Sequence, residues 1–365
     1  RPGRVDSFQT AGDLFVQFSH GPYHGYTREL DLSSGMATVS YGAMRPDGAR
    51  FRRELVGHLT EDLILARFSC DGKPFSCVLW LDRIHDPACT VHRQAAARGL
   101  RLHGDIRDGI SFEIWADVFA GEARLEILDG AKLAVTDATE VLVAINIGTS
   151  AHGEPPVTEC AARHLSTTDW TELVRLHQEE HLRHYGGVEL MLPFEEPDLP
   201  TDERLCSLRS GRADPGLSLL YFNYGRYLLC ASSANATLPA TLQGRWCEEI
   251  LPPWNSDLHQ DVNIQMAYWG AEAGGLQAYT DALFQHIERQ VPHGREAARK
   301  LDDCDGVWFP IQTDPWGRCT PESDGWAVWI GAAPWLSQHL WWHYEFSLDR
   351  NFLRERAYPF LKDVA

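Results

Sequence analysis

The chain has 365 residues, 44% hydrophobic and 23% charged, so it can bury a large core, and its length predicts about two domains. This composition excludes collagen, a disordered tail and a small disulfide scaffold, and no apolar run approaches the roughly 18 residues of a membrane span. With 33 basic against 51 acidic residues, the net charge of −18 disfavours nucleic acid as a partner and favours a neutral or cationic ligand.

Residues 1–160 are predicted to form an antiparallel β-sandwich. Apolar and polar residues alternate in the segments 13–19, 25–32, 50–56 and 110–116, and turn sequences rich in Gly, Asp and Ser separate them. Many short strands without a long helical run are typical of a sandwich of two sheets. The segment 140–147 is almost continuously apolar, which indicates a strand covered on both faces.

The periodicity becomes helical after the sandwich. Residues 161–200 are predicted to form a linker helix and a connector, and residues 201–365 a helical domain. Within it we expect helices near 215–231, 261–273, 277–301 and 326–346, and one from Asp349, its N-cap, to the end. About six helices fit, half of a closed toroid of helix pairs, and the last has no capping glycine. The expectation is an incomplete (α/α)6 toroid in a chain that lacks both its natural ends.

Tryptophan is unevenly distributed. Of the 13 tryptophans, ten lie after residue 245. Aromatic faces stack on the C–H faces of sugar rings, so the tryptophans beside turn-forming Gly, Pro or Asn, namely Trp246, Trp254 and Trp316, are predicted to line a carbohydrate cleft. Those inside one predicted helix, Trp335, Trp341 and Trp342, are better explained as filling helix–helix contacts.

The segment 242–272 concentrates the candidate chemistry. A loop rich in Pro, Trp and Asn leads into the predicted helix at 261, where Asp261 suits an N-cap as well as a catalytic role. On one face of this helix we expect Gln265, Tyr268, Trp269 and Glu272. This combination of amide, phenol, indole and carboxylate favours recognition of sugar hydroxyls.

Three strings from this region resemble glycoside hydrolase family 95, whose best-known members are α-L-fucosidases. They are LPATLQGRW at 238–246, PPWNSD at 252–257 and DVNIQMAYWGAE at 261–272, and the segments 11–14, 26–32, 332–346 and 349–359 are similar too. The resemblance implies a β-sandwich (supersandwich-like), a linker helix and an (α/α)6 toroid. It also implies an inverting mechanism in which an Asn-x-Asn pair helps an aspartate to activate water.

That pair falls on Asp261 and Asn263, the candidate catalytic residues. Asp at 261 and Ala at 267 depart from the family pattern and put strict fucose specificity in question. The residues expected to line the sugar pocket are Trp246, Trp254, Asn255, His259, Tyr268, Trp269 and Glu272. The family's general acid and main base lie beyond this chain, so residues 1–365 alone are expected not to turn over substrate.

The expected function is therefore inverting hydrolysis of terminal α-L-sugars in an oligosaccharide or glycan, without a cofactor or metal. Two alternatives stay open: a glycoside phosphorylase of similar architecture, which the acidic surroundings of Asp261 disfavour, and a carbohydrate-binding protein without catalysis. The sequence predicts no oligomeric state.

Cysteines and histidines add little chemistry. Nine cysteines without a CxxC pair favour reduced thiols and so a reducing compartment. His339 and His343 have the i,i+4 spacing of zinc ligands but no third ligand, so packing is the better interpretation. His181 and His184 are expected on the surface of the linker helix.

Overall fold

The computed structural model describes residues 5–44, 47–71, 73–151, 165–194, 197–322 and 328–365. These residues form two compact units, Thr10–Leu182 and a second unit that joins Arg1–Gln9 to Arg183–Ala365. The sequence-based boundaries at 160 and 200 stay predictions, but the structure divides the chain inside the expected linker helix and assigns the first nine residues to the helical unit.

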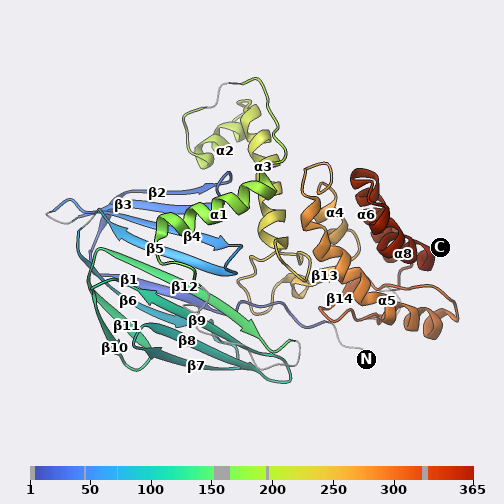
Figure 1. Cartoon of the computed structure of the whole chain (residues 1–365), viewed down its shortest axis with the longest axis horizontal. Coiled ribbons are helices and arrows are strands. Elements are labelled where there is room, and N and C mark those ends of the chain that lie inside the picture. The colour runs from blue at the N-terminus through green and yellow to red at the C-terminus, as the bar shows by residue number, and fades with distance from the viewer. Residues whose placement is uncertain (1–4, 45–46, 72, 152–164, 195–196, 323–327) are drawn as a thin grey trace. The chain divides into compact units, whose positions relative to one another are not determined.

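The first unit is a sandwich of two antiparallel sheets, as predicted (Figure 1). A four-stranded sheet has the order β1-β6-β11-β10, and an eight-stranded sheet has the order β2-β3-β4-β5-β12-β9-β8-β7. The strands are β1 Asp13–Phe18, β2 Tyr23–Asp31, β3 Met36–Ala43, β4 Arg50–His58, β5 Leu63–Cys70, β6 Phe75–Asp82, β7 Cys89–Ala96, β8 Gly99–Ile106, β9 Ser111–Phe119, β10 Arg124–Leu128, β11 Lys132–Ala138 and β12 Glu140–Thr149.

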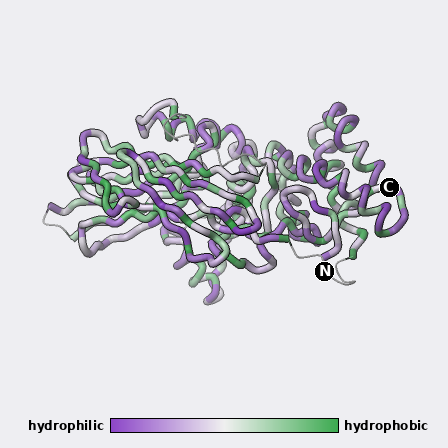
Figure 2. The backbone as a smooth tube through the Cα atoms, turned by 90° about the horizontal axis from the view of Figure 1, so that it is seen from below, coloured by the Kyte–Doolittle hydropathy of each residue, from purple (hydrophilic) through white to green (hydrophobic). Residues whose placement is uncertain are grey.

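Alternation along the strands places the sandwich core between the sheets. In β6, Phe75, Cys77, Leu79 and Leu81 are buried at every second position, as expected for a strand with one covered face. In Figure 2 short hydrophilic and hydrophobic stretches follow one another along the backbone.

Strand β12 is covered on both faces, as its continuous apolar sequence predicted. Val141 and Val143 belong to the core between the sheets, whereas Leu142 and Ala144 belong to a second apolar cluster with Leu173 of helix α1. This helix, α1 Trp170–Tyr185, therefore covers the outer face of the large sheet through the part that belongs to the sandwich unit.

Three histidines also attach α1 to this sheet. The Nε2 atoms of His58, His177 and His181 lie 3.0, 2.8 and 2.9 Å from the backbone oxygens of Leu173, Ser34 and Leu32. Because a carbonyl can only accept, Nε2–H is the donor in each bond. The prediction that His181 lies on the surface was wrong: its ring is buried and bonded to the Leu32 carbonyl in the turn between β2 and β3.

The second unit is mainly helical, and it resembles part of the predicted toroid. Its helices are α2 Thr201–Arg209, α3 Pro215–Ser233, α4 Asn263–Tyr268, α5 Asp281–Asp302, α6 Ala332–Ser347, α7 Arg350–Phe352 and α8 Tyr358–Val364, with shorter turns η2 Pro253–Ser256, η3 Gln277–Tyr279 and η4 Leu353–Ala357 and the two-stranded pair β13 Leu258–His259 and β14 Gln312–Thr313. Within the described residues, no helix is long and apolar enough to cross a membrane.

Helix ends show where local sequence governs the fold. Asp349 caps α7 as predicted, because its carboxylate accepts from the backbone amides of Asn351 and Phe352. The helix predicted at 261–273 was too long, since α4 spans only Asn263–Tyr268 and turns follow it. Asp261 is not its N-cap; Val262 occupies that position in a left-handed conformation and without a side-chain cap.

Eight described cysteines form no disulfide bond with one another, and Cys160 lies outside the described residues. Among the described residues no three His, Cys, Asp or Glu side chains form a group that could hold a metal ion.

Candidate functional site

The turn Asp261–Asn263 carries the two residues predicted to handle water, and both are exposed. Between them, Val262 has φ 97° and ψ −16°. A left-handed backbone at a β-branched residue is an outlier that costs roughly 1–3 kcal/mol and persists only where the surroundings enforce it. The strained conformation of Val262 therefore lowers the stability of the fold while it places Asp261 and Asn263 at this turn.

Three fully buried glutamines hold the backbone around Val262 in this strained conformation. Gln260 donates from Nε2 to Gln290 Oε1 and to the Pro310 carbonyl, both at 3.0 Å, and Gln290 donates back to Gln260 Oε1 at 3.1 Å. Gln265 donates to the Gln260 carbonyl at 2.7 Å. Among the described residues Gln265 Oε1 has no hydrogen-bond partner, but both amide groups of Gln260 and Gln290 are bonded to each other, and these bonds hold the turn from the interior.

The loop before this turn is strained too. Trp254, Asn255 and Ser256 have φ angles of 55°, 58° and 48°, three successive left-handed residues other than glycine. Asn255 is not free to meet a ligand: Nδ2 donates to the Val5 carbonyl at 2.7 Å and Oδ1 accepts from Ser7 at 3.2 Å. Asn255 thus anchors the N-terminal segment of this unit, whereas the Trp254 side chain is left 56% exposed.

A carboxylate–histidine pair lies beside Trp254. His259 Nδ1 is 3.1 Å from Asp257 Oδ1, and Asp257 is completely buried. The indole of Trp254 meets the His259 ring edge-on at 6.2 Å. A buried carboxylate on Nδ1 fixes the tautomer and orientation of a histidine and leaves Nε2 available for another partner.

Tyr268 is a structural residue in this conformation. It is 1% exposed, its hydroxyl lies 2.6 Å from Ser233 Oγ, and it accepts from the Ala240 amide at 3.0 Å. Burial raises the pKa of this phenol. The side chain ties α4 to the end of α3 and to the following loop, so it supports the site from inside.

Glu272 lies beyond the end of α4 and is also buried, at 7% exposure. Its Oε1 is 2.8 Å from His343 Nδ1 on α6, and its Oε2 has no hydrogen-bond partner among the described residues. This hydrogen bond accounts for the position of His343, whereas His339 is buried against the Trp342 ring. The zinc-like spacing of the two histidines therefore reflects packing.

Two further indoles line the surface of this unit. Trp269 is 47% exposed and contacts Trp335 and Trp342 of α6, with ring centroids 6.4 and 5.5 Å away. Trp246 is half-exposed, and its ring lies over Gly244. A Cβ added at Gly244, where φ is +64°, would lie only 2.7 Å from a ring carbon of Trp246. Glycine is therefore required at 244 for Trp246 to take this position.

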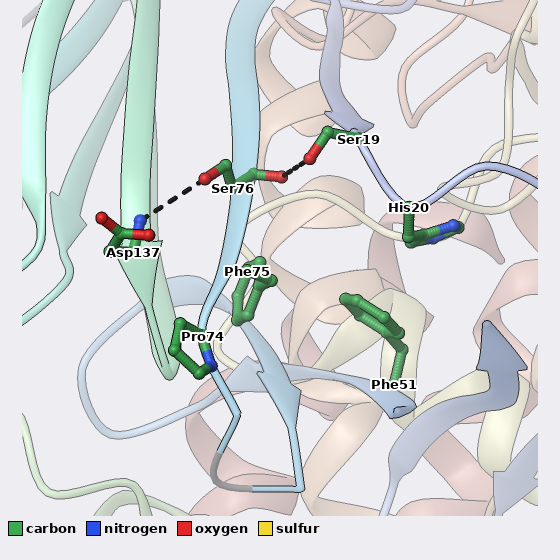
Figure 3. A pocket seen from close by; sticks show the side chains of 7 residues that line it. All are labelled: Ser19, His20, Phe51, Pro74, Phe75, Ser76 and Asp137. Carbon is green, nitrogen blue, oxygen red and sulfur yellow. Dashed lines mark hydrogen bonds between the residues drawn. The ribbon is translucent and has the colours of Figure 1, made fainter. Parts of the chain in front are cut away.

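The predicted residues thus divide into two groups. Six are at least partly accessible and could meet a ligand: Trp246, Trp254, His259, Asp261, Asn263 and Trp269. Asn255, Tyr268 and Glu272 instead form internal bonds, so the expected single face of amide, phenol, indole and carboxylate is not presented together. The pocket in Figure 3 lies in the sandwich unit, and none of the predicted residues lines it.

Sequence reasoning missed the residues that hold the site. Gln290 and His343 lie 30 and 71 residues from their partners, and neither carries a local motif that predicts the pairing. The buried glutamines could have been suspected only from Gln260 and Gln265, which lie so close to the candidate turn.

Comparison with known proteins supports this architecture. A solved structure described as a putative kojibiose phosphorylase from human microbiome matches with a TM-score of 0.62 at 11% identity, over 96% of this chain and 48% of that one. Residues 2–154 match the model of the glycosyl hydrolase family 65 N-terminal domain. These matches show the fold, an N-terminal β-sandwich followed by part of a helical toroid.

Residues 169–365, more than half of the chain, match the glycosyl hydrolase family 95 catalytic domain, and the chain belongs to this family. It is 28% identical to Alpha-L-fucosidase 2 of Arabidopsis thaliana over 98% of this chain and 47% of the relative. It is 34% identical to Probable alpha-fucosidase A of Aspergillus niger, over 52% of this chain and 25% of the relative. The chain spans about half or less of the length of these relatives.

Proposed function

We propose that this protein hydrolyses terminal α-L-fucosides, or closely related α-L-sugars, with inversion of the anomeric centre. Membership of family 95 and the names of the curated relatives support the substrate class. The observation that carries the proposal is the strained, exposed turn at Asp261–Asn263, which the buried glutamines hold in place.

In this proposal the turn positions the attacking water. Inverting hydrolysis needs an acid on one side of the sugar and a base on the other, about 6.5–9.5 Å apart, with the water next to the base. The Asn263 amide can both donate to and accept from a water molecule, and the Asp261 carboxylate can accept a water proton in a hydrogen bond. Asp261 and Asn263 therefore orient the water, and the acid and main base are not assigned to described residues.

The accessible aromatic side chains form the proposed sugar contacts. Trp246, Trp254 and Trp269 each leave about half of their surface exposed and can stack on the apolar face of a pyranose. His259, oriented by Asp257, presents Nε2 to a sugar hydroxyl. Tyr268, Asn255 and Glu272 act as positioning residues behind these contacts.

The test is calorimetric and kinetic titration of the full-length protein with an α-L-fucosyl oligosaccharide, because residues 1–365 alone are expected not to turn over substrate. Asn263→Ala removes one hydrogen bond of about 0.5–1.5 kcal/mol, so sugar affinity should fall by no more than about tenfold. Hydrolysis should fall further, by about 10²-fold, because misplaced water reacts slowly. The control is Tyr221→Ser on α3, whose side chain is 80% exposed.

Three results would contradict the proposal. Equal hydrolysis by Asn263→Ala and by the Tyr221→Ser control would remove Asn263 from the mechanism. Release of sugar phosphate only in the presence of inorganic phosphate would establish a phosphorylase. Sugar binding by the enzyme without any turnover would establish a carbohydrate-binding protein.

A further inference from the structure

One end of the β-sandwich contains a pocket of about 280 Å³ that the proposed function does not use (Figure 3). It is built from the sandwich unit alone, where β1 ends and where β4 and β6 begin. Its lining combines two hydroxyls, a carboxylate and flat apolar rings, in Ser19, Ser76, Asp137, His20, Phe51, Phe75 and Pro74. The volume is at the lower end of the range for small-molecule sites, so it suits a ligand the size of one sugar ring.

A β-bulge places the carboxylate at this pocket. The pairing of β11 with β6 shifts between Val135 and Ala138, so that one extra residue is accommodated, and Asp137 takes φ +59°. The Asp137 amide donates to Ser76 Oγ at 3.4 Å. Bulges of this kind redirect side chains and occur often beside functional sites. The Asp137 side chain is exposed, and among the described residues its carboxylate has no hydrogen-bond partner.

The polar side of the pocket is continuous. In Figure 3 the bonds run from Asp137 through Ser76 to Ser19, whose hydroxyl donates to the Ser76 carbonyl at 3.2 Å. The Ser76 hydroxyl accepts from the Asp137 amide and keeps its own proton for a ligand. This side therefore offers a carboxylate acceptor, a hydroxyl donor and a further hydroxyl acceptor in sequence.

The opposite side is a rigid aromatic wall. His20 Nδ1 lies 2.8 Å from the Gly21 carbonyl and therefore carries the proton, so Nε2 accepts from the Tyr41 hydroxyl at 2.9 Å. The ring packs against Phe51 with centroids 4.6 Å apart, and Arg53 donates to the same Tyr41 hydroxyl at 3.0 Å. Because both ring nitrogens are bonded, His20 is held in one orientation beside Phe51, and the two ring planes are inclined by 53°.

We propose that this end of the sandwich binds a single neutral sugar residue of a glycan, in addition to the sugar handled at the Asp261–Asn263 turn. A carboxylate that accepts from two neighbouring hydroxyls, beside an aromatic wall, is suited to the polar edge and apolar face of a pyranose. Asp137 is the acidic side chain of the lining, and no Lys or Arg lies among the lining residues, so a phosphate or carboxylate ligand is disfavoured. A lone carboxylate also lacks the further ligands of a metal site among the described residues.

The experiment compares Asp137→Gly with Asp129→Gly. Glycine tolerates the left-handed conformation at both positions, where φ is 59° and 51°, and Asp129 is an exposed residue of the β10–β11 turn outside the pocket. Each substitution is made alone and together with Asn263→Ala, and calorimetry is run with methyl α-L-fucoside, methyl β-D-galactoside and methyl α-D-glucoside. The unfolding temperature of each variant verifies that the sandwich is intact.

The expected result is that at least one of these neutral glycosides binds Asn263→Ala at two sites, because that substitution weakens the turn site by no more than about tenfold. Asp137→Gly should then remove the second binding event or weaken it more than tenfold, while Asp129→Gly leaves it unchanged. Equal binding by both glycine variants, or a single binding event in Asn263→Ala that Asp137→Gly does not change, would overturn the sandwich site and leave the proposed function intact. Binding of a cationic amino sugar but of no neutral glycoside would also overturn it. Failure of the proposed function would instead appear as unchanged hydrolysis in Asn263→Ala.

Discussion

Acid should loosen helix α1 from the sandwich through His177. The ring is 3% exposed and donates to the Ser34 carbonyl, while its Nδ1 is buried without a hydrogen-bond partner among the described residues. Burial lowers its pKa from 6.5 to about 4, and the neighbouring His181 and His58 rings act in the same direction. Protonation of His177 must therefore either place a charge in the buried contact between α1 and the large sheet or release α1 from the sheet.

The sign and size follow from linkage. Well above pH 6.5 the ring is neutral in both the folded and the unfolded state, and its contribution to stability is complete. As the pH falls toward about 4, the unfolded state binds a proton that the folded state does not, so stability is lost. The two pKa values give a loss of about 2 kcal/mol at about pH 5 and about 3 kcal/mol at about pH 4.

Hydrogen exchange measured by mass spectrometry can isolate this effect in peptides from α1. The free energy of opening is compared between about pH 7.5 and about pH 5, after correction for intrinsic exchange. His177→Gln keeps a donor for the Ser34 carbonyl but does not titrate, so its pH dependence should be flatter by about 2 kcal/mol. His92→Gln, an exposed histidine of β7, should retain the original dependence. Equal slopes in all three proteins would refute the reasoning.

Two further substitutions test the support of the candidate site. Tyr268→Phe leaves the buried Ala240 amide without its acceptor and should reduce the free energy of unfolding by about 1–3 kcal/mol, with sugar affinity little changed; a large loss of affinity without a loss of stability would place Tyr268 in the sugar pocket after all. His343→Ala leaves the buried Glu272 side chain without its hydrogen-bond partner and should reduce the free energy of unfolding in urea by about 1–3 kcal/mol, whereas the exposed His293→Ala should cost little. Equal stability of the two histidine variants would contradict a structural role for this hydrogen bond.

The sandwich was predictable because its strands repeat one local rule. Alternation marked β1, β2, β4 and β9 within a few residues of their ends, and the apolar run in β12 correctly indicated two covered faces. Both patterns are local, so a single sequence suffices to recognise them.

The candidate site was only partly predictable, because its geometry depends on distant partners. The helical pattern from residue 261 onward hid the left-handed Val262, which shortens α4 at its start. Tyr268 and Glu272 are residue types that often contact sugars, but here both are buried and form hydrogen bonds with Ser233 and His343. Polar residues next to a candidate site can therefore serve to hold it, and the sequence alone does not separate the two roles.

The most direct test of the central claim is the configuration of the first sugar released from an α-L-fucoside, followed by proton NMR before mutarotation. Inverting attack by a water held at the Asp261–Asn263 turn predicts that the β-anomer appears first and that Asn263→Ala slows its appearance. Initial release of the α-anomer would contradict the account, because a retaining enzyme would attack the sugar with a protein carboxylate instead of with the positioned water.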